Sequence, residues 1–416
     1  MLIAWRQRLA RLLTWRRARA YALILVAIYL VAWVDVLVLG TPPLNSAGEP
    51  LVGDYIAFQT AGTLIAAGHA DQMYDHAPVV NVQHVLLGNA LPAFYDAYRN
   101  PPFFALIYVP LASLDLIWAF AVWFLISVAC LGVAIRLLLE EVPDLKRRWR
   151  GLLIFIFAFA PVYFGLIDGE NATLSLLLFV LIYRAFSRGE ERALGVWAAL
   201  GLFKPQLFFI FPLVFLITRR WRALLTYALT ACVLFAISFV VVGADGLQAW
   251  VRILLEPEGG NAVSNGWRMA SAKALFDGLL PGLGTLSLLA YLGIAAVLLV
   301  VLWQVWRRPD LNLPVAFAVT CLVAVLLDPH LVDYDLTVLV TAGILAAALV
   351  PRYALAILPL YVATFGRAQI PIGDARLQFT APLLLALTAW VFFETRPVTE
   401  REAVLTNASQ VMVAHN

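Results

Sequence analysis

The sequence predicts an all-α polytopic membrane protein, and three observations support that prediction. Hydrophobic residues make up 63% of the 416 positions and charged residues only 13%, with a mean hydropathy of +0.87. Soluble domains average about 45–50% apolar and about 25% charged residues. The apolar residues also gather in long segments, and the basic residues gather on one side of them. This composition excludes a water-soluble globule and a disordered chain.

The apolar segments are predicted to cross the membrane as helices, because a helix needs about 20 residues to span a hydrocarbon core of ~30 Å. We count twelve segments, which with their loops form a single integral membrane domain over residues 1–416. The segments are residues 20–40, 115–139, 151–167, 171–186, 193–203, 206–218, 222–242, 284–306, 313–329, 334–350, 352–365 and 377–394.

The basic residues orient these segments, because Lys and Arg favour the cytoplasmic side of membrane proteins. The first nineteen residues carry six arginines. With twelve crossings, 22 of the 29 Lys and Arg residues fall on the side of the N-terminus and 7 fall on the opposite side. The N-terminal residues 1–19 and the tail 395–416 are therefore predicted to be cytoplasmic, with the protein in the inner (plasma) membrane of the cell.

Two of the segments are too short to cross the membrane alone. As helices, residues 193–203 extend ~16 Å and residues 206–218 extend ~20 Å. We expect a broken pair of helices that meets at Lys204-Pro205 on the outer side. Broken helices at membrane depth are tolerated where they line a cavity.

Two predicted outer loops are large, residues 41–114 and residues 243–283. In the first loop, apolar residues recur at helical spacing in three stretches that are too short to span. These stretches are residues 54–67, 77–88 and 101–114. We expect three amphipathic helices that lie on the outer surface of the membrane.

The sequence lacks the motifs of soluble cofactor binding. It contains no Walker A motif and no Gly-x-Gly-x-x-Gly after a strand, which argues against an ATP-driven pump. Cys130, Cys232 and Cys321 lie in apolar runs without a Cys-x-x-Cys pair. We therefore expect no cofactor, no metal ion and no nucleic-acid partner.

Four polar clusters fall at helix ends on the predicted outer side. They are Gly53-Asp54-Tyr55, Asp168-Gly169-Glu170-Asn171, Lys204-Pro205-Gln206 and the run from Asp328 to Asp335. Ionisable groups at membrane depth are costly and usually line a functional cavity. Purely structural roles stay open at this point, because Asp is a favoured helix N-cap residue and a lysine can reach the interface from a span.

Three runs of sequence carry a resemblance. The first is GDYIAFQTAG with the later YDAYRNPP, the second extends from FGLIDGENATL to the break at FKPQLF, and the third is LLDPHLVDYDL. In this order, over roughly residues 50–340, they resemble the signature segments of glycosyltransferase family 87. Two residues depart from the family pattern: Glu170 stands where the family has Gln, and Asp328 stands where it has Ser.

The resemblance implies a C-type membrane glycosyltransferase. Such an enzyme moves a hexose, typically mannose, from a polyprenyl-phosphate donor in the membrane lipid to a hydroxyl of a glycan or glycolipid acceptor at the outer face, with inversion. Asp54 matches the acidic residue that begins the family's first outer helix and is the expected base. The donor phosphate is expected to contact Lys204, His330 and Arg99, with Arg268 as a further helper. Contacts with the sugar and the acceptor are expected from Tyr55, Glu170, Asn171, Gln206, Asp333, Tyr334 and Asp335.

Two other classes of protein stay open at this point. A transporter or lipid flippase also uses broken helices at mid-depth, but it would expose polar groups to both sides, and the sequence shows no internal repeat. A polymerase or ligase of lipid-linked glycans would share the compartment and use a different donor. The gathering of the polar clusters on one side favours the glycosyltransferase.

Overall fold

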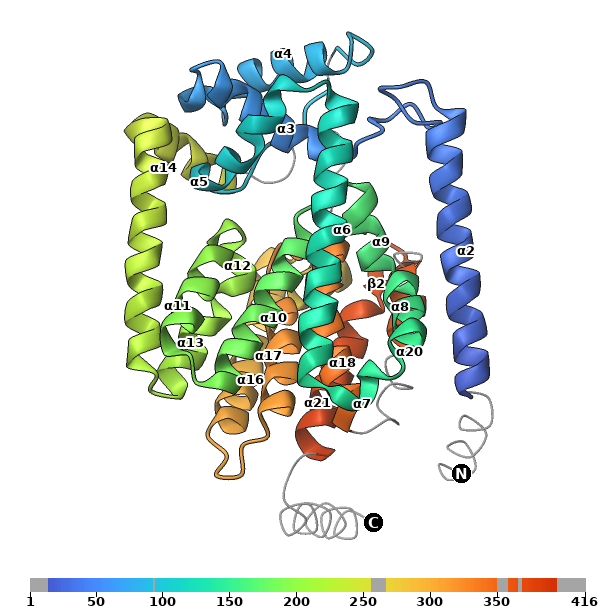
Figure 1. The fold of residues 1–416 in the computed structure, drawn as a ribbon, viewed down its shortest axis with the longest axis vertical. Helices are drawn as coiled ribbons and strands as arrows, with labels where there is room; N and C mark the ends of the chain where they lie inside the picture. Colours follow the sequence, from blue (N-terminus) through green and yellow to red (C-terminus); the bar gives the residue numbers. More distant parts are fainter. Residues whose placement is uncertain (1–13, 93, 256–266, 350–357, 366–368, 395–416) are drawn as a thin grey trace.

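The computed structural model describes residues 14–92, 94–255, 267–349, 358–365 and 369–394 (Figure 1). Within these ranges the regular structure is almost entirely helical, so the predicted all-α class is confirmed. The one departure is a hairpin of strands β1 (Gln369–Ile372) and β2 (Ala375–Gln378), which pair antiparallel.

The helices follow one another along the chain, with α marking α-helices and η marking short 3-10 helices. The first half forms α2 (Trp15–Leu39), α3 (Tyr55–Ala66), η1 (Ala70–Gln72), α4 (His76–Leu86), α5 (Pro102–Ala105), η2 (Leu106–Ser113), α6 (Leu116–Glu141), α7 (Pro143–Lys146), α8 (Trp149–Ala158), α9 (Ala160–Ile167) and α10 (Ala172–Arg188). The second half forms α11 (Glu191–Leu200), η3 (Gly201–Phe203), α12 (Pro205–Phe208), α13 (Ile210–Ile217), α14 (Trp221–Leu255), α15 (Ala272–Leu279), α16 (Gly284–Trp306), α17 (Leu313–Leu327), η5 (Asp333–Val338), α18 (Leu339–Leu349), α20 (Leu358–Phe365) and α21 (Thr380–Glu394).

Several of these helices suit a membrane. Among the described residues, α2, α6, α14 and α16 are each long and apolar enough to cross alone. Helices α8 and α9 form a fifth crossing if they are taken together, although they are bent by 68° at their junction. Other apolar helices, such as α17 and α21, have 10–17 residues. The chain is therefore a multi-pass membrane protein, while the count of twelve crossings stays a prediction.

The helices form a bundle that is capped at one end (Figure 1). Helices α3, α4 and α5 lie across this end, which we call the loop face. Helix α17 runs through the interior, and every residue from Val315 to Leu327 is buried. The opposite end, where α14 begins and where α16 and α21 end, is called the basic face below.

The first large loop forms the three predicted helical segments, but α3 does not lie on the surface as expected. Nine of its twelve residues are buried, because α4 covers it and the α5–η2 segment packs beneath. Gly62 permits the close approach to η2, since a Cβ there would lie 2.7 Å from the backbone oxygen of Tyr108. The apolar spacing predicted the helix correctly, whereas its burial depends on α4 and, above all, on η2, which lies some fifty residues further along the chain.

The predicted break at Lys204-Pro205 is present. Helix α11 continues into η3, which ends at Phe203, and α12 begins at Pro205. Lys204 lies between them with φ −126° and ψ 72°, as expected for a residue that precedes a proline. The ring of Phe208 takes the space that a Cβ on Gly201 would need, 2.0 Å away. The second helix therefore turns back sharply and leaves Lys204 at the tip of the break.

The second large loop begins as a helix rather than as irregular chain. Helix α14 continues past the predicted end of its span to Leu255, with a kink at Gly243, where φ is 67° and ψ is −170°. A positive φ of this kind suits glycine, which has no Cβ. After the kink the helix packs beneath the first loop, against η1 and α5.

Several predictions fall wholly or partly on residues outside the described ranges. They concern residues 1–13 of the N-terminal segment, residue 93 of the first large loop, residues 256–266 of the second, residue 350 of the segment 334–350, residues 352–357 of the segment 352–365, and the tail 395–416.

Candidate functional site

Two glycines interlock the start of α3 with the turn between α9 and α10. A Cβ on Gly53 would lie 2.6 Å from the Cα of Asp168, and a Cβ on Gly169 would lie 2.5 Å from the Cβ of Tyr55. The backbone N–H of Tyr55 donates to the carbonyl oxygen of Asp168 at 3.0 Å. Because both glycines have positive φ, at 54° and 66°, only glycine fits without strain. This junction places Asp54 beside the turn that carries Asp168 and Glu170.

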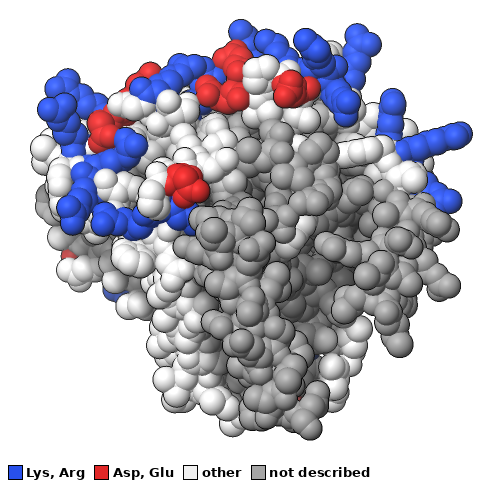
Figure 2. Space-filling view, turned by 90° about the horizontal axis from the view of Figure 1, so that it is seen from below, with Lys and Arg blue, Asp and Glu red and all other residues white. Residues whose placement is uncertain are grey.

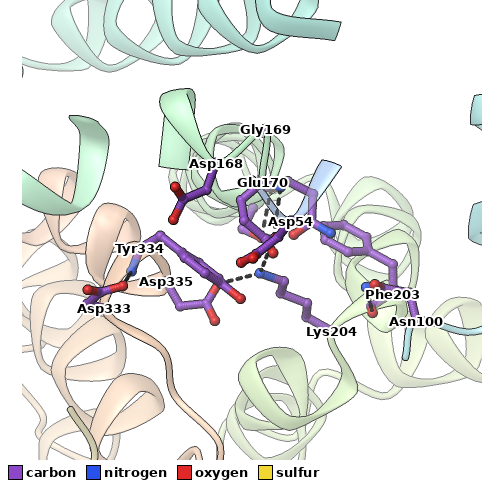
Figure 3. A network of polar contacts seen from close by, with 12 residues as sticks. Asp54, Asn100, Asp168, Gly169, Glu170, Phe203, Lys204, Asp333, Tyr334 and Asp335 are labelled. Atoms are coloured by element: carbon purple, nitrogen blue, oxygen red, sulfur yellow. Dashed lines mark hydrogen bonds and ion pairs between the residues drawn. The ribbon is translucent and has the colours of Figure 1, made fainter. Parts of the chain in front are cut away.

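Lys204 forms a buried ion pair beneath this junction (Figure 3). Its Nζ lies 2.5 Å from Oδ1 of Asp335 and 3.5 Å from Oε2 of Glu170. The ammonium group also lies 4.8 Å from the centre of the Tyr334 ring. A buried charge is stable only when it is paired and hydrogen-bonded, and the carboxylates on η5 and the α9–α10 turn meet that need.

Arg268 joins three carboxylates from different parts of the chain. Its Nη2 lies 2.5 Å from Oδ2 of Asp168, its Nη1 lies 3.4 Å from Oδ2 of Asp54, and its Nε lies 3.7 Å from Oδ1 of Asp333. The guanidinium carbon is 5.3 Å from the Tyr334 ring centre. The Tyr334 ring therefore contacts both cations, and we call the two ion-paired groups the Lys204 half and the Arg268 half of one acidic centre.

Backbone pairing fixes the position of Arg268. Met269 forms a bridge with Val332, and the N–H of Asp333 donates to the carbonyl oxygen of Arg268 at 3.1 Å. The β1–β2 hairpin supports the same segment, since Nε2 of Gln369 donates to the carbonyl oxygen of Trp267 at 2.8 Å. The arginine and Asp333 thus arrive at the centre on two paired segments.

The YDAYRNPP segment passes along the other side of the centre and is held from both ends. Nδ2 of Asn100 donates to the carbonyl oxygen of Phe203, next to Lys204, at 2.9 Å (Figure 3). The side chain of Gln83 accepts from the backbone N–H of Asp96 at 2.9 Å and donates to its carbonyl oxygen at 2.6 Å. The segment is therefore a fixed wall that also positions the break at Lys204.

Negative charge exceeds positive charge in the acidic centre. Its carboxylates are Asp54, Asp168, Glu170, Asp333 and Asp335, and its cations are Lys204 and Arg268. Burial raises the pKa of the Glu170 carboxyl, and the positive charge of Lys204 opposes that rise. Burial lowers the pKa of Arg268, but the carboxylates of Asp54 and Asp168 more than offset this, so the pKa of the guanidinium is raised and it stays charged.

Asp96 lies within electrostatic reach of the centre. Burial raises the pKa of its carboxyl well above the usual range, and the negative charges of Asp54 and Glu170 raise it further. The positive charges of Arg99 and Arg268 oppose that rise only in part. The raised pKa favours the protonated form of Asp96, which can donate a hydrogen bond.

Seven of the residues proposed from the sequence meet in the acidic centre. They are Asp54, Glu170, Lys204, Arg268, Asp333, Tyr334 and Asp335. The Asp54 side chain does not cap α3, although the residue holds the N-cap position. Asn171 is fully buried next to Glu170, and neither its Oδ1 nor its Nδ2 has a hydrogen-bond partner among the described atoms.

Four of the proposed residues lie elsewhere. The hydroxyl of Tyr55 donates to Oε1 of Gln59 at 2.9 Å, inside the aromatic core rather than at the centre. Arg99 donates from Nη1 to the carbonyl oxygen of Ile253 at 2.9 Å. The side chain of His330 is exposed, and only its backbone N–H bonds to Asp328. Gln206 is half-buried on α12.

Two acids of the centre region were not assigned a role from the sequence, Asp168 and Asp96. Asp168 stood in a recognised polar cluster, but nothing in the sequence showed that an arginine a hundred residues later would pair with it. Asp96 lies in the YDAYRNPP run, in which the sequence indicated a phosphate-binding role for Arg99 and none for Asp96. Among the described residues, no group of three or more His, Cys, Asp or Glu side chains is arranged to hold a metal ion.

Fold and site together define a class: a multi-pass helical membrane protein with a charged centre beneath a cap of loop helices. The sequence profile of glycosyltransferase family 87 matches residues 98–329, which is more than half of the chain. The chain therefore belongs to glycosyltransferase family 87 and is a membrane glycosyltransferase. No curated protein and no solved structure matches the chain.

The matched range contains Glu170, Lys204 and Arg268 but ends before Asp333, and it begins after Asp54. Asp54 therefore lies outside the range that the family profile matches, and it is linked to that range by its contacts in the structure. The ion pair between Arg268 and Asp54 supplies the main connection.

Proposed function

We propose that this protein transfers a hexose, with mannose as the favoured sugar, from a polyprenyl-phosphate donor to a hydroxyl of a glycan or glycolipid at the outer face of the plasma membrane. The observation that carries this proposal is the Arg268 half of the centre. It joins a carboxylate that is one-third exposed, on Asp54, to a cation that is held in place by two further acids.

Asp54 is the proposed base. Its carboxylate accepts the proton of the acceptor hydroxyl while the hydroxyl oxygen forms a bond with the anomeric carbon. The bond between that carbon and the phosphate oxygen breaks, and its electron pair leaves with the polyprenyl phosphate. Attack opposite the leaving phosphate inverts the anomeric centre. The Asp54 side chain is suited to this role because it does not cap α3 and is the most exposed carboxylate of the ion-paired set.

Two features of the centre suit the charges that develop during transfer. Glycosyl transfer passes through a transition state with positive charge on the sugar ring, and the excess of carboxylates stabilises it. The departing phosphate gains negative charge, and preorganised cations stabilise it. We assign this second role first to Arg268 and then to Lys204, because the partners of Arg268 are more exposed than those of Lys204.

The remaining polar residues have proposed binding roles. We propose that Glu170, Asp333 and Asp335 accept hydrogen bonds from sugar or acceptor hydroxyls, in addition to their ion pairs. Asn171 offers both a donor and an acceptor that lack partners among the described atoms. His330 and Arg99 lie outside the ion-paired set. We propose only peripheral contacts with the donor for these two residues.

The membrane orientation is a separate part of the proposal. With both termini in the cytoplasm, the acidic centre beneath the loop face lies on the outer side, where a lipid-linked donor replaces nucleotide sugars. A cysteine introduced for the exposed Asp75, in the first loop, tests this. We expect labelling of intact cells by an impermeant thiol reagent. Labelling only after permeabilisation would place the centre on the cytoplasmic side.

The transfer itself is tested in membranes from cells that make the protein and from cells that lack it. We expect label to move from radiolabelled polyprenyl-phosphate-mannose to a product only when the protein is present, and not when Asp54→Asn replaces it. A nucleotide-activated mannose serves as the competing donor. Transfer from the nucleotide sugar alone would refute the lipid donor, and translocation of unchanged labelled lipid would indicate a transporter.

A further inference from the structure

A second charged site lies on the basic face, at the far end of the bundle from the acidic centre (Figures 1 and 2). A cavity of about 720 Å³ opens between the turn that joins α13 to α14 and the end of α16. Ligand pockets commonly enclose about 300–1,000 Å³. Its lining includes Arg219, Arg220, Arg222, Arg307, Trp306 and Glu191.

The cavity carries an excess of positive charge that its own partners do not neutralise. Among the described residues of the lining, Glu191 is the single acid, and it forms an ion pair with Arg220. Arg220 also lies over the Phe186 ring, 5.1 Å from its centre, and so belongs to the wall. The other three arginines, Arg219, Arg222 and Arg307, are exposed at the rim. Figure 2 shows how Lys and Arg side chains gather on this face.

The backbone of the α13–α14 turn favours glycine at a position that holds arginine. Arg219 has a φ of 55°, in the left-handed region where a side chain is strained. The turn is closed by the backbone N–H of Arg220, which donates to the carbonyl oxygen of Phe215 at 2.8 Å. Helices commonly end in this way with glycine at the left-handed position. Strain at such a position is characteristic of functional sites, and here it is borne by a cation at the rim of the cavity.

The surroundings of the cavity suit a lipid. Helix α14 begins beside it and exposes Leu225, Leu229 and Val233 along its length, and α16, which ends beside it, exposes Val300. Trp221 is 61% exposed at the start of α14. Exposed tryptophans mark the level of lipid headgroups. An anionic group in the cavity therefore lies at headgroup depth, with apolar helix surfaces leading away from it into the membrane.

We propose that this cavity binds the phosphodiester headgroup of an anionic phospholipid, whose acyl chains run along α14 and α16. The three rim arginines pair with the phosphate, as basic pockets between membrane helices do for anionic headgroups. The general preference of basic residues for the cytoplasmic side accounts for their number. It does not require that they converge on one cavity or that one of them adopt a strained backbone. The site is independent of the proposed transfer reaction.

The test uses the purified full-length protein in neutral detergent, with no need for activity. Phosphatidylglycerol and phosphatidylcholine are added separately, and binding is followed by native mass spectrometry and by the melting temperature. We expect phosphatidylglycerol to bind more tightly than phosphatidylcholine. The triple variant Arg219→Gln, Arg222→Gln, Arg307→Gln should lose about 100-fold in affinity, because each basic side chain contributes about fivefold to binding of an anionic lipid. Arg220 is left unchanged because it pairs with Glu191.

The matched control is Lys146→Gln, Arg147→Gln, Arg150→Gln, which removes the same charge from exposed residues of another segment. It should bind phosphatidylglycerol like the unmodified protein. The double variant Arg222→Gln, Arg307→Gln spares the strained turn, and we expect it to lose about 25-fold, so the test remains decisive if the triple variant does not fold. Equal losses in pocket and control variants, no preference for the anionic lipid, or equal binding of inorganic phosphate would each overturn the proposal.

Discussion

The two halves of the acidic centre share the Tyr334 ring but differ in their access to solvent. In the Lys204 half, the side chains of Lys204, Glu170 and Asp335 are 7%, 6% and 4% exposed. In the Arg268 half, Arg268 is 11% exposed, while Asp54 and Asp168 are 33% and 19% exposed. The Lys204 half is thus almost completely buried, whereas in the Arg268 half Asp54 and Asp168 are partly exposed and only Asp333, at 5%, is as buried.

This difference separates two uses of buried charge. A sealed ion pair mainly holds its elements in place, and removing one partner leaves an uncompensated charge that destabilises the fold. An accessible carboxylate beside a fixed cation is free to exchange a proton with a bound hydroxyl. We therefore expect substitutions in the Lys204 half to affect stability first, and substitutions in the Arg268 half to affect turnover first.

The largest expected effect on turnover comes from Asp54→Asn. The amide keeps the shape of the side chain but cannot accept a proton, and general base catalysis contributes about 10²–10⁴-fold. We expect the initial rate of transfer to fall by that factor while donor binding is retained. A variant that keeps more than about a tenth of the rate would exclude Asp54 as the base.

Lys204→Met should have the largest effect on stability. The change leaves Asp335 and Glu170 buried without their cation, and breaking a buried pair costs about 3–5 kcal/mol. Thermal or denaturant unfolding in detergent measures this. The control is Lys273→Met, which breaks an exposed pair with Asp277 within α15 and should cost about 0.3–0.5 kcal/mol. Equal losses in the two variants would contradict a structural role for the Lys204 half.

Arg268→Gln should have an intermediate effect, mainly on transfer. It removes the charge-assisted contacts of the guanidinium, each worth about 1.5–3 kcal/mol, or roughly 10- to 150-fold in rate. Arg268→Lys keeps the charge without the forked geometry and should fall between that variant and the unmodified protein. Arg376→Gln removes an exposed arginine from the nearby hairpin as the control. If Arg376→Gln loses as much activity as Arg268→Gln, the loss reflects the change in net charge near the acidic centre and not the specific contacts of Arg268.

The smallest expected effect is that of Asp96→Asn, and it depends on pH. The folded-state pKa of Asp96 is raised above its unfolded value of about 3.9, so the folded protein binds the extra proton. Its contribution to stability is therefore present at low pH and is lost as pH rises through the raised pKa. The asparagine variant lacks this dependence.

We expect the melting temperature of the unmodified protein, relative to Asp96→Asn, to decrease as pH rises above the unfolded pKa of about 3.9. A relative gain with rising pH would mean that Asp96 is ionised and paired with Arg99 or Arg268.

Much of the fold was predictable because it depends on local patterns. The apolar runs fixed helices such as α6 and α16 within about two residues, and the Pro205 signal located the break at Lys204. The burial of α3 was not predictable, because it depends on tertiary packing against α4 and against η2, which lies far along the chain. The continuation of α14 beyond the kink at Gly243 was not predicted. Hydropathy marks where a membrane span ends, and a helix can continue past that point.

The site was predictable as a set of polar clusters on one face but not as a network. The sequence located Asp54, Glu170, Lys204 and Asp335, since each lies at a helix end next to a turn or proline. It did not indicate that Arg268 bridges three of the segments, because that pairing depends on the backbone bridge between Met269 and Val332. The Tyr55 ring lies in the core, because an aromatic ring next to a polar cluster can turn into the core as readily as toward that cluster.

The division between the two halves is tested most directly by measuring initial rate and melting temperature for Asp54→Asn and Asp335→Asn on the same preparations. Both changes replace one carboxylate with an amide. We predict that Asp54→Asn loses at least about 100-fold in rate with a melting temperature within about 2 °C of the unmodified protein. Asp335→Asn should lower the melting temperature by a larger amount, because Lys204 loses its closest partner. Near-normal turnover in Asp54→Asn, or unchanged stability in Asp335→Asn, would contradict the assignment of proton transfer to the Arg268 half and of the main structural support to the Lys204 half.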